Sequence, residues 1–374
     1  MRSSDLVRVK QVDRPTTRIT EGVQRIDMRD TAYGLAERGV YGPVVQQGVR
    51  RSLPGKVPLS AAQKDVIDYL ALIQANAVAP RIAPIPQEPE LLTHHIKAAS
   101  YFLTADIVGT CRVPLSAYYS HDKQGNPIHP EYENAIVLVM RKDWKAMHAS
   151  TGSDWMGDPI SFQAYERLAL AAETMANYVR RLGWPASAQY GPSFVNRYSV
   201  LIPPLLIQAG IGEVSRAGII LSPYLGLGFK AAAVLTNMPL VPDKPIDFGL
   251  QRFCQDCRIC AENCPSHAIS TGDKVLYNGY ETWKLDTKRC ASFNFTNQKG
   301  TMCNRCVKSC PWTLPTTAPH NLVRAMIVRS RLAQQIAIRA ARLLRTGEGD
   351  PAGKWWFDME YAGDTLELRG EGRE

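Results

Sequence analysis

The chain has 374 residues, of which 45% are hydrophobic and 21% are charged. This balance is typical of a soluble globular protein of two to three domains and excludes intrinsic disorder for most of the chain. No uncharged stretch reaches about 18 consecutive apolar residues, so we expect no transmembrane segment. The net charge of +9 favours an acidic partner or substrate. No dense basic arm interleaved with aromatic side chains accompanies this charge, so no nucleic-acid partner is expected.

Targeting signals give a second expectation. The N-terminus, from Met1 to Arg8, has no apolar stretch after its charges, and the Arg50-Arg51 pair is not followed by a hydrophobic region. Secretory and twin-arginine signals both need such a region. We therefore expect a cytoplasmic protein.

The N-terminal two thirds of the chain alternates predicted helices and strands. Residues 1–60 are polar and rich in Arg, and we expect them to form an extended arm. The elements predicted after this arm are a helix from Ser60, a helix at Pro89–Thr104, a strand at Asp106–Val113, a buried strand at Asn134–Met140 and a helix at Phe162–Leu182 that ends at Gly183. This alternation indicates an α/β core, which we place at residues 61–248.

The C-terminal third begins with a cysteine-rich block, which we place at residues 249–315. The remaining residues, 316–374, are expected to pack back on the core, mainly as one helix over Asn321–Arg345 with six Arg and no acid. We expect this helix to turn its basic face to solvent, although a membrane-surface helix is an alternative.

Eight of the nine cysteines fall within this block. The first run has the C-x2-C-x2-C-x3-C-P spacing of bacterial ferredoxins, and the second repeats it with a longer first gap. In such pairs the last Cys of each run ligates the other cluster. The predicted ligand sets are therefore Cys254, Cys257, Cys260 and Cys310 for one [4Fe–4S] cluster, and Cys264, Cys290, Cys303 and Cys306 for the other. Two structural zinc sites are the alternative, but zinc pairs are usually separated C-x2-C hooks. The ninth, Cys111, lies in an apolar context and is expected to be a buried structural thiol.

Several segments resemble the corrinoid-dependent reductive dehalogenases, and the resemblance covers nearly the whole chain. The most specific segment is Ala209–Gly218, which is similar to the family's A-G-x-G-E-x-x-R-x-G stretch. The segments Leu221–Gly226 and Val234–Leu240, together with the spacing of the second cysteine run, also match. The resemblance implies an α+β fold with a nitroreductase-like corrinoid-binding domain and a ferredoxin-like domain with two clusters. It also implies a base-off cobalamin whose cobalt has no protein His ligand.

The resemblance also implies site residues. Asn196 matches the family's site Asn, and counting from it gives Tyr165 as the proton donor, with Tyr178 as the second candidate. Lys230 falls at the position of the basic partner, and Gly226 and Gly228 are expected at the cofactor. A cation beside a phenol favours the phenolate that remains after proton donation. The segment after Gly226 departs from the family, which commonly has a Pro and two basic residues there, and this leaves the substrate and the role of Lys230 open.

The resemblance implies reductive removal of halide from an organohalide, and an aromatic organohalide is expected. The chain shows no fused flavin reductase domain of the kind that some members carry, so an external low-potential donor, ferredoxin or flavodoxin, is expected. Two alternatives remain. One is another cobalamin and iron–sulfur reductase, such as epoxyqueuosine reductase acting on tRNA. The other is a non-catalytic electron carrier or corrinoid-binding protein.

Overall fold

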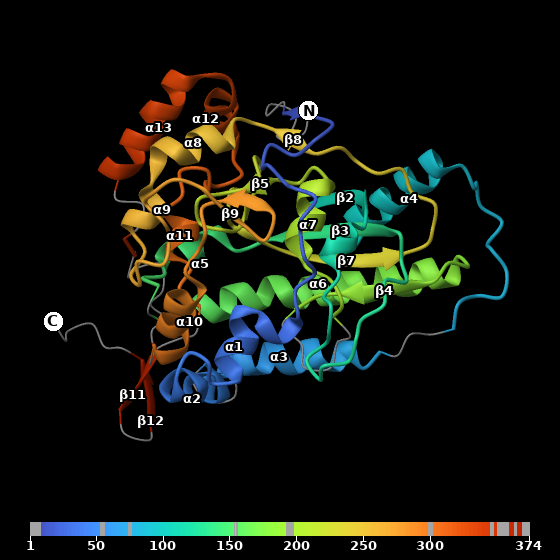
Figure 1. The fold of residues 1–374 in the computed structure, drawn as a ribbon, viewed down its shortest axis with the longest axis horizontal. Helices are drawn as coiled ribbons and strands as arrows, with labels where there is room; N and C mark the ends of the chain where they lie inside the picture. The colour runs from blue at the N-terminus through green and yellow to red at the C-terminus, as the bar shows by residue number, and fades with distance from the viewer. Residues whose placement is uncertain are drawn as a thin grey trace.

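A computed structural model describes residues 9–52, 57–73, 77–152, 154, 156–191, 198–297, 302–344, 348–349, 359–362 and 365–368. A four-stranded antiparallel sheet in the order β2-β3-β7-β4 forms its centre (Figure 1). The strands are β2 (Ile107–Arg112), β3 (Asn134–Arg141), β4 (Ala186–Gln189) and β7 (Phe229–Thr236). The α+β class is confirmed.

Both faces of this sheet are covered, which explains the continuous apolar run in β3. Ile136 and Leu138 pack with helix α6 (Gly157–Arg181), whereas Val137 and Val139 pack with helix α7 (Ile202–Gln208) on the other face. A strand buried on both faces needs apolar side chains at every position rather than at alternate ones. The predicted strands at Asp106–Val113 and Asn134–Met140 are both present.

Three helices cover the α6 side of the sheet. Helix α3 (Pro58–Ala71) packs along α6, and α4 (Pro89–Phe102) packs against β2. The helices predicted from Ser60 and over Pro89–Thr104 are thus confirmed. Helix α6 ends near the predicted Gly183 but begins five residues before Phe162, because Pro159 is tolerated in the first helical turn.

The N-terminal residues are extended only as far as Asp27. The helices that follow are η2 (Met28–Asp30), α1 (Ala32–Glu37) and α2 (Pro43–Ser52). The expectation of an extended arm over residues 1–60 is therefore wrong from Met28 onward, where the chain forms helices. Three small apolar side chains, Ala36, Val45 and Val49, bury these short helices against Phe295. So few apolar residues over two short helices give a weak periodic pattern in the sequence.

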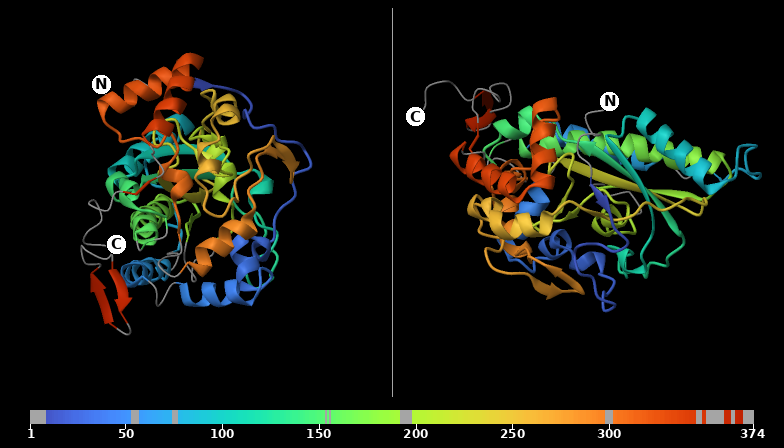
Figure 2. Two further views of the ribbon diagram at one scale, coloured as in Figure 1. Left: turned by 90° about the vertical axis from the view of Figure 1, so that its left-hand side faces the viewer. Right: turned by 90° about the horizontal axis from the view of Figure 1, so that it is seen from above.

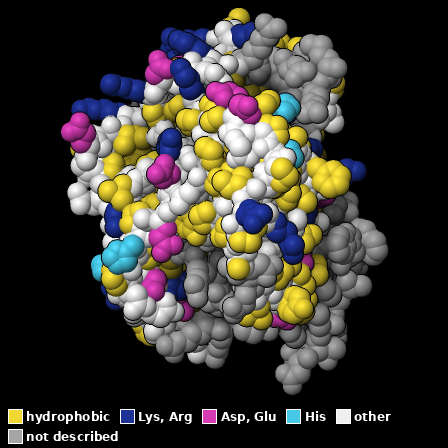
Figure 3. Space-filling view, turned by 90° about the vertical axis from the view of Figure 1, so that its right-hand side faces the viewer, with side chains coloured by type: hydrophobic (Ala, Val, Ile, Leu, Met, Phe, Trp, Pro, Cys, Tyr) yellow, Lys and Arg dark blue, Asp and Glu magenta, His cyan; other side chains and the backbone are white. Residues whose placement is uncertain are grey.

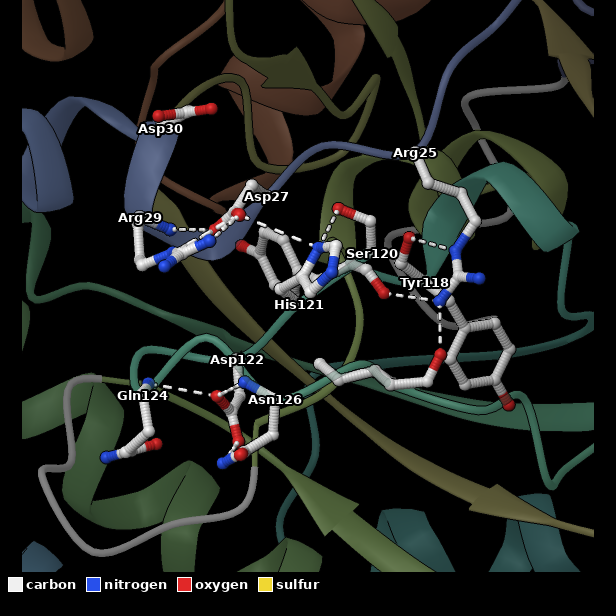
Figure 4. A network of polar contacts seen from close by, with 12 residues as sticks. Arg25, Asp27, Arg29, Asp30, Tyr118, Ser120, His121, Asp122, Gln124 and Asn126 are labelled. Carbon is white, nitrogen blue, oxygen red and sulfur yellow. Dashed lines mark hydrogen bonds and ion pairs between the residues drawn. The ribbon is translucent and has the colours of Figure 1, made fainter.

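A polar network holds the extended part of the arm on the core (Figure 4). Arg25 donates hydrogen bonds to the backbone carbonyls of Tyr118, Tyr119 and Ile128. Asp27 accepts from Arg29 and lies 3.6 Å from His121 Nδ1. The arm is consequently fixed by side-chain hydrogen bonds more than by apolar burial.

The cysteine-rich block and the C-terminal helices gather at one end of the molecule, and α4 lies at the other (Figures 1 and 2). The elements of the block are α8 (Leu250–Cys257), α9 (Ile259–Glu262), β9 (Val275–Tyr277), β10 (Tyr280–Thr282), α10 (Thr287–Thr296) and α11 (Arg305–Lys308). The smaller elements elsewhere are β1 (Lys10–Gln11), η3 (Leu115–Ala117), α5 (Trp144–Ala149), β5 (Glu213–Val214), β6 (Ile220–Leu221), β8 (Ile246–Asp247) and the hairpin β11 (Met359–Ala362) with β12 (Thr365–Leu368).

The C-terminal segment differs from the single helix that the sequence predicted. Two helices, α12 (Ala318–Arg329) and α13 (Arg331–Leu343), meet at Ser330, whose extended backbone breaks the helix and whose hydroxyl caps α13. They pack mainly on the cysteine-rich block, where Ile327 and Ile338 join its apolar cluster, and not on the sheet core as expected. Within the described part of the chain, no helix has both the length and the apolar content needed to cross a bilayer.

Candidate functional site

A cavity of about 510 Å³ lies where the sheet core meets the cysteine-rich block. The polar side chains that line it come from both parts and are Lys142, Tyr165, Tyr198, Lys230, Ser266, Asn294, Asn304 and the thiols of Cys264, Cys290, Cys303 and Cys306. Most of its other lining residues are apolar. Among the described lining residues there is no Asp, Glu or His. The described lining residues therefore offer neither a carboxylate nor an imidazole to a metal.

The structure brings Tyr165 and Lys230 together in this cavity. Tyr165 projects from α6 and is half-buried, and Lys230 projects from β7. The Lys230 Nζ lies 4.7 Å from the centroid of the Tyr165 ring. At this distance the ammonium group makes a cation–π contact with the phenol ring.

The second candidate, Tyr178, has different surroundings. It lies 13 residues further along α6, about 20 Å at the rise of a helix, and is not among the described lining residues. Its hydroxyl and His95 Nε2 are 2.6 Å apart. This hydrogen bond and its contact with the main apolar cluster give Tyr178 a structural role.

Two titratable lining residues, Lys142 and Tyr198, were missed by the sequence prediction. Lys142 is 4% exposed, and its Nζ donates to Asn304 Oδ1 at 2.7 Å. Burial and the charge of Lys230 hold the pKa of Lys142 well below its usual value, and the Cys306 thiol opposes this. Burial raises the pKa of Tyr198 well above its usual value, helped by Tyr119 and Tyr165. Lys142 could have been found from the sequence because it directly follows the buried strand β3, which ends near the site.

The remaining predicted residues lie elsewhere. Asn196 is outside the described residues. Gly226 has φ +61°, and an added β-carbon would come within 2.6 Å of the Thr313 backbone; one on Gly228 would lie 3.2 Å from Thr313 Cγ2. Neither glycine is among the cavity-lining residues. Close packing against Thr313 of the cysteine-rich block thus explains why glycine occupies both positions. A role of these glycines in cofactor binding stays a prediction.

The eight clustered cysteines fall into two groups in space. One group lines a small separate cavity under α8 and consists of Cys254, Cys257, Cys260 and Cys310. The other four line the large cavity. These are the two sets predicted by crossing the last cysteine of each run, and in each set the thiols influence one another electrostatically.

The thiol groups fit iron–sulfur clusters better than single ions. All eight are free of disulfide bonds. Among the described residues no three His, Cys, Asp or Glu side chains approach closely enough for one metal ion. A four-iron cube holds its thiolates further apart than a zinc ion with Zn–S bonds of about 2.3 Å. Burial raises the pKa of Cys254 to about 12 and of Cys257 to about 11, so cationic iron is needed to keep the thiolates ionised.

Cys111 has no part in either group. It is buried in β2, its Sγ lies 3.7 Å from the Leu205 carbonyl oxygen, and burial raises its pKa to about 12. The expected structural thiol is confirmed.

Comparison with known proteins gives related chains of one main kind. Residues 253–319 match the family model of a 4Fe-4S dicluster domain. The tetrachloroethene reductive dehalogenase of Sulfurospirillum multivorans is 27% identical over 339 residues, which cover 77% of this chain and 65% of that protein. The trichloroethene reductive dehalogenase of Dehalococcoides mccartyi is 37% identical over 231 residues, which cover 56% of this chain and 37% of that one.

Among solved structures, the catabolic reductive dehalogenase NpRdhA in complex with 3-bromo-4-hydroxybenzoic acid superposes with a TM-score of 0.90 at 33% identity. The match covers 98% of this chain and 53% of that one. An epoxyqueuosine reductase of Aliivibrio fischeri is 27% identical over 199 residues, 47% of this chain and 49% of that protein. The chain thus spans 65% or less of the length of each of these proteins.

Proposed function

The chain is a homologue of the reductive dehalogenases, and from this premise we propose that it reduces an organohalide at a base-off cobalamin supplied with electrons by two [4Fe–4S] clusters. The reaction consumes two electrons and one proton and yields the dehalogenated product and a halide ion. The observation that carries the proposal is the Tyr165–Lys230 pair, which shares one cavity with four cysteines. The corrinoid site is assigned to residues 61–248 and the clusters to residues 249–315.

The residues of the cavity have separate tasks in this proposal. Tyr165 donates the proton to the carbon that loses the halogen, and Lys230 stabilises the phenolate left behind. The apolar walls exclude water from the reacting centre. A bound cobalamin would supply the low-valent cobalt chemistry needed to break a carbon–halogen bond. Because the described lining residues include no His, they fit a cobalamin without a protein imidazole ligand.

The substrate we propose is an anionic halogenated aromatic, such as a halophenolate. Lys142 and Lys230 place two amine hydrogen-bond donors in a cavity that has no described carboxylate. An anionic oxygen of the substrate could accept hydrogen bonds from these amines, whereas a neutral haloalkene has no such acceptor. The bound 3-bromo-4-hydroxybenzoic acid of the solved relative is a molecule of this class.

The electron donor we propose is a separate small acidic protein, a ferredoxin or flavodoxin. The positive net charge of this chain would assist its association with such a donor.

The first test is the cofactor content of protein produced anaerobically with cobalamin supplied. We expect about eight iron atoms and one cobalt per chain, followed by halide release from a panel of halophenols. Eight iron atoms without cobalt would overturn the proposal. Turnover of an epoxyqueuosine-containing tRNA stem-loop, with no halide release from the panel, would favour the reductase alternative.

A further inference from the structure

Arg216 is a fully buried cation beside the first cysteine group. It lies in the turn between β5 and β6 and is 1% exposed. Its guanidinium packs 4.7 Å from the ring centroid of Trp283. It also lines the small cavity that holds Cys254, Cys257, Cys260 and Cys310.

All the hydrogen bonds of this guanidinium go to backbone carbonyls. The Nε donates to Cys254 at 2.7 Å, Nη1 donates to Ser270 at 2.8 Å and Gly272 at 2.9 Å, and Nη2 donates to Gln255 at 3.3 Å. These bonds join Arg216 to helix α8, which carries Cys254, and to the segment that contains Ser270 and Gly272. They do not neutralise the charge, because carbonyl oxygens are only dipoles.

No carboxylate among the described residues pairs with Arg216. The carboxylate of Glu213, three residues earlier, is engaged by Thr16, Gln251 and the backbone N–H of Phe248. An arginine stays charged in proteins, and burial of an unpaired charge is costly. The anionic partner must therefore come from the thiolates, and the electrostatic neighbours of Arg216 are the thiols of Cys254, Cys257 and Cys260.

We propose that Arg216 is the internal counter-cation of the cluster bound by Cys254, Cys257, Cys260 and Cys310 and raises the reduction potential of that cluster. This proposal rests on the iron–sulfur part of the proposed function. When this cluster accepts one electron from the external donor, its negative charge rises by one unit. A fixed buried cation stabilises this reduced form more than the oxidised form. Arg258 and Arg342 also lie near this cluster, but both are exposed, so solvent and salt weaken their effect.

The chain offers a matched control in Arg324. This side chain is also fully buried, and it donates to the carbonyls of Trp312, Leu314 and Pro315. Burial alone lowers its pKa to about 10, with no contribution from a cysteine thiol. Loss of its charge should therefore disturb packing as loss of Arg216 does, without a direct electrostatic effect on the cluster.

The test is a redox titration of Arg216→Gln, Arg216→Lys and Arg324→Gln, monitored by electron paramagnetic resonance, on anaerobically prepared protein with its iron content measured. We expect Arg216→Gln to shift the equilibrium of one cluster at least tenfold toward the oxidised form, a fall of about 59 mV for one electron. The other cluster should shift by less than threefold. Arg216→Lys keeps the charge and should stay within threefold of the unmodified protein, as should Arg324→Gln.

The outcomes separate an electrostatic role from a purely structural one. An equal shift in Arg216→Gln and Arg324→Gln, or a tenfold shift in Arg216→Lys, would overturn the proposal. Loss of iron from both Arg216 variants but not from Arg324→Gln would also overturn it and leave Arg216 with a structural role in holding helix α8. The dehalogenase proposal is judged separately, since none of these readouts requires turnover.

Discussion

Tyr165 and Tyr178 show how surroundings separate two residues that the sequence presents alike. Both lie on α6, and family spacing alone left both as candidates. Tyr165 faces the cavity beside Lys230, whereas Tyr178 bonds to His95. The spacing of apolar residues predicts helix α6. It does not show which of the two tyrosines faces the cavity, because the cavity is formed by elements that are distant in sequence. For the same reason Lys142 was not predicted, since its site partner Asn304 lies 162 residues away.

Removal of the Tyr165 hydroxyl should abolish proton donation. In Tyr165→Phe we expect halide release to fall at least about 100-fold, the usual contribution of a positioned acid, while iron and cobalt content stay normal. Anaerobic steady-state assays of halide release measure this. Tyr178→Phe is the matched control and should retain activity within about threefold. Full activity of Tyr165→Phe would show that another group supplies the proton.

Lys142 should matter most for charged substrates. A hydrogen bond to a charged group contributes about 1.5–3 kcal/mol, so Lys142→Met should lower kcat/KM for a halophenolate by about tenfold or more. The value for a neutral haloalkene should change little, because it has no charge to bind. The exposed Lys145, replaced by Met, provides the control. Equal losses for both substrates in Lys142→Met would contradict an anion-binding role.

At the scale of elements, long periodic segments were predicted well and short ones were not. The helices α3, α4 and α6 and the strands β2 and β3 follow their sequence patterns closely. Helices α1 and α2 were missed because each buries too few side chains to show a period. The break at Ser330 was missed because no helix-breaking Gly or Pro lies there, and the signal that was present is Ser330 itself, a residue type favoured at helix N-caps.

The arm network predicts a pH-dependent contribution to stability. The Arg29 side chain, with smaller help from its backbone N–H and from His121, lowers the pKa of Asp27 to about 2. A carboxyl whose pKa is lower in the folded state stabilises the fold above its unfolded pKa of about 3.9, and this contribution is lost as the pH falls toward 2. In Asp27→Asn the free energy of unfolding at pH 7 should fall by about 1 kcal/mol, less than the pKa shift alone implies, because Arg29 is 40% exposed.

Chemical denaturation between pH 7 and pH 3 measures this effect. The difference between the unmodified protein and Asp27→Asn should shrink as the pH falls below about 5. Asp30→Asn is the control, since Asp30 is 59% exposed and pairs with Arg38 at 3.2 Å. A difference that stays constant over this range would assign the effect of Asp27 to its capping of η2 rather than to its charge.

At the scale of the whole molecule, the charges are distributed unevenly. The face near α4 mixes both signs with scattered hydrophobic side chains (Figure 3). In contrast, α12 and α13 contain Arg and no acidic residue. Arg342 of α13 donates to the Cys257 carbonyl oxygen at 3.0 Å, so this basic surface lies over the first cysteine group. The overall basic charge was readable from composition, but its position over these thiols required the fold.

This distribution predicts that electron delivery depends on salt. With an acidic ferredoxin or flavodoxin as donor, the reduction rate at low protein concentration should fall at least about tenfold between 0.01 M and 0.3 M salt. Arg339→Gln should lower the rate at low salt, whereas Arg112→Gln, on a sheet strand, should not. Stopped-flow spectroscopy measures both. Reduction by a small viologen provides the control, and a salt effect of equal size there would argue against docking on this surface.

The interleaving of the two cysteine groups sets an order for their completion during synthesis. Cys254 begins the first group, but Cys310, the last cysteine of the chain, completes it. The second group lies wholly between these two positions and is complete at Cys306. The group that starts first is therefore finished last, and three of its thiols leave the ribosome 50 residues before the fourth. A chain that ended after Cys306 would contain all four cysteines of the second group but only three of the first.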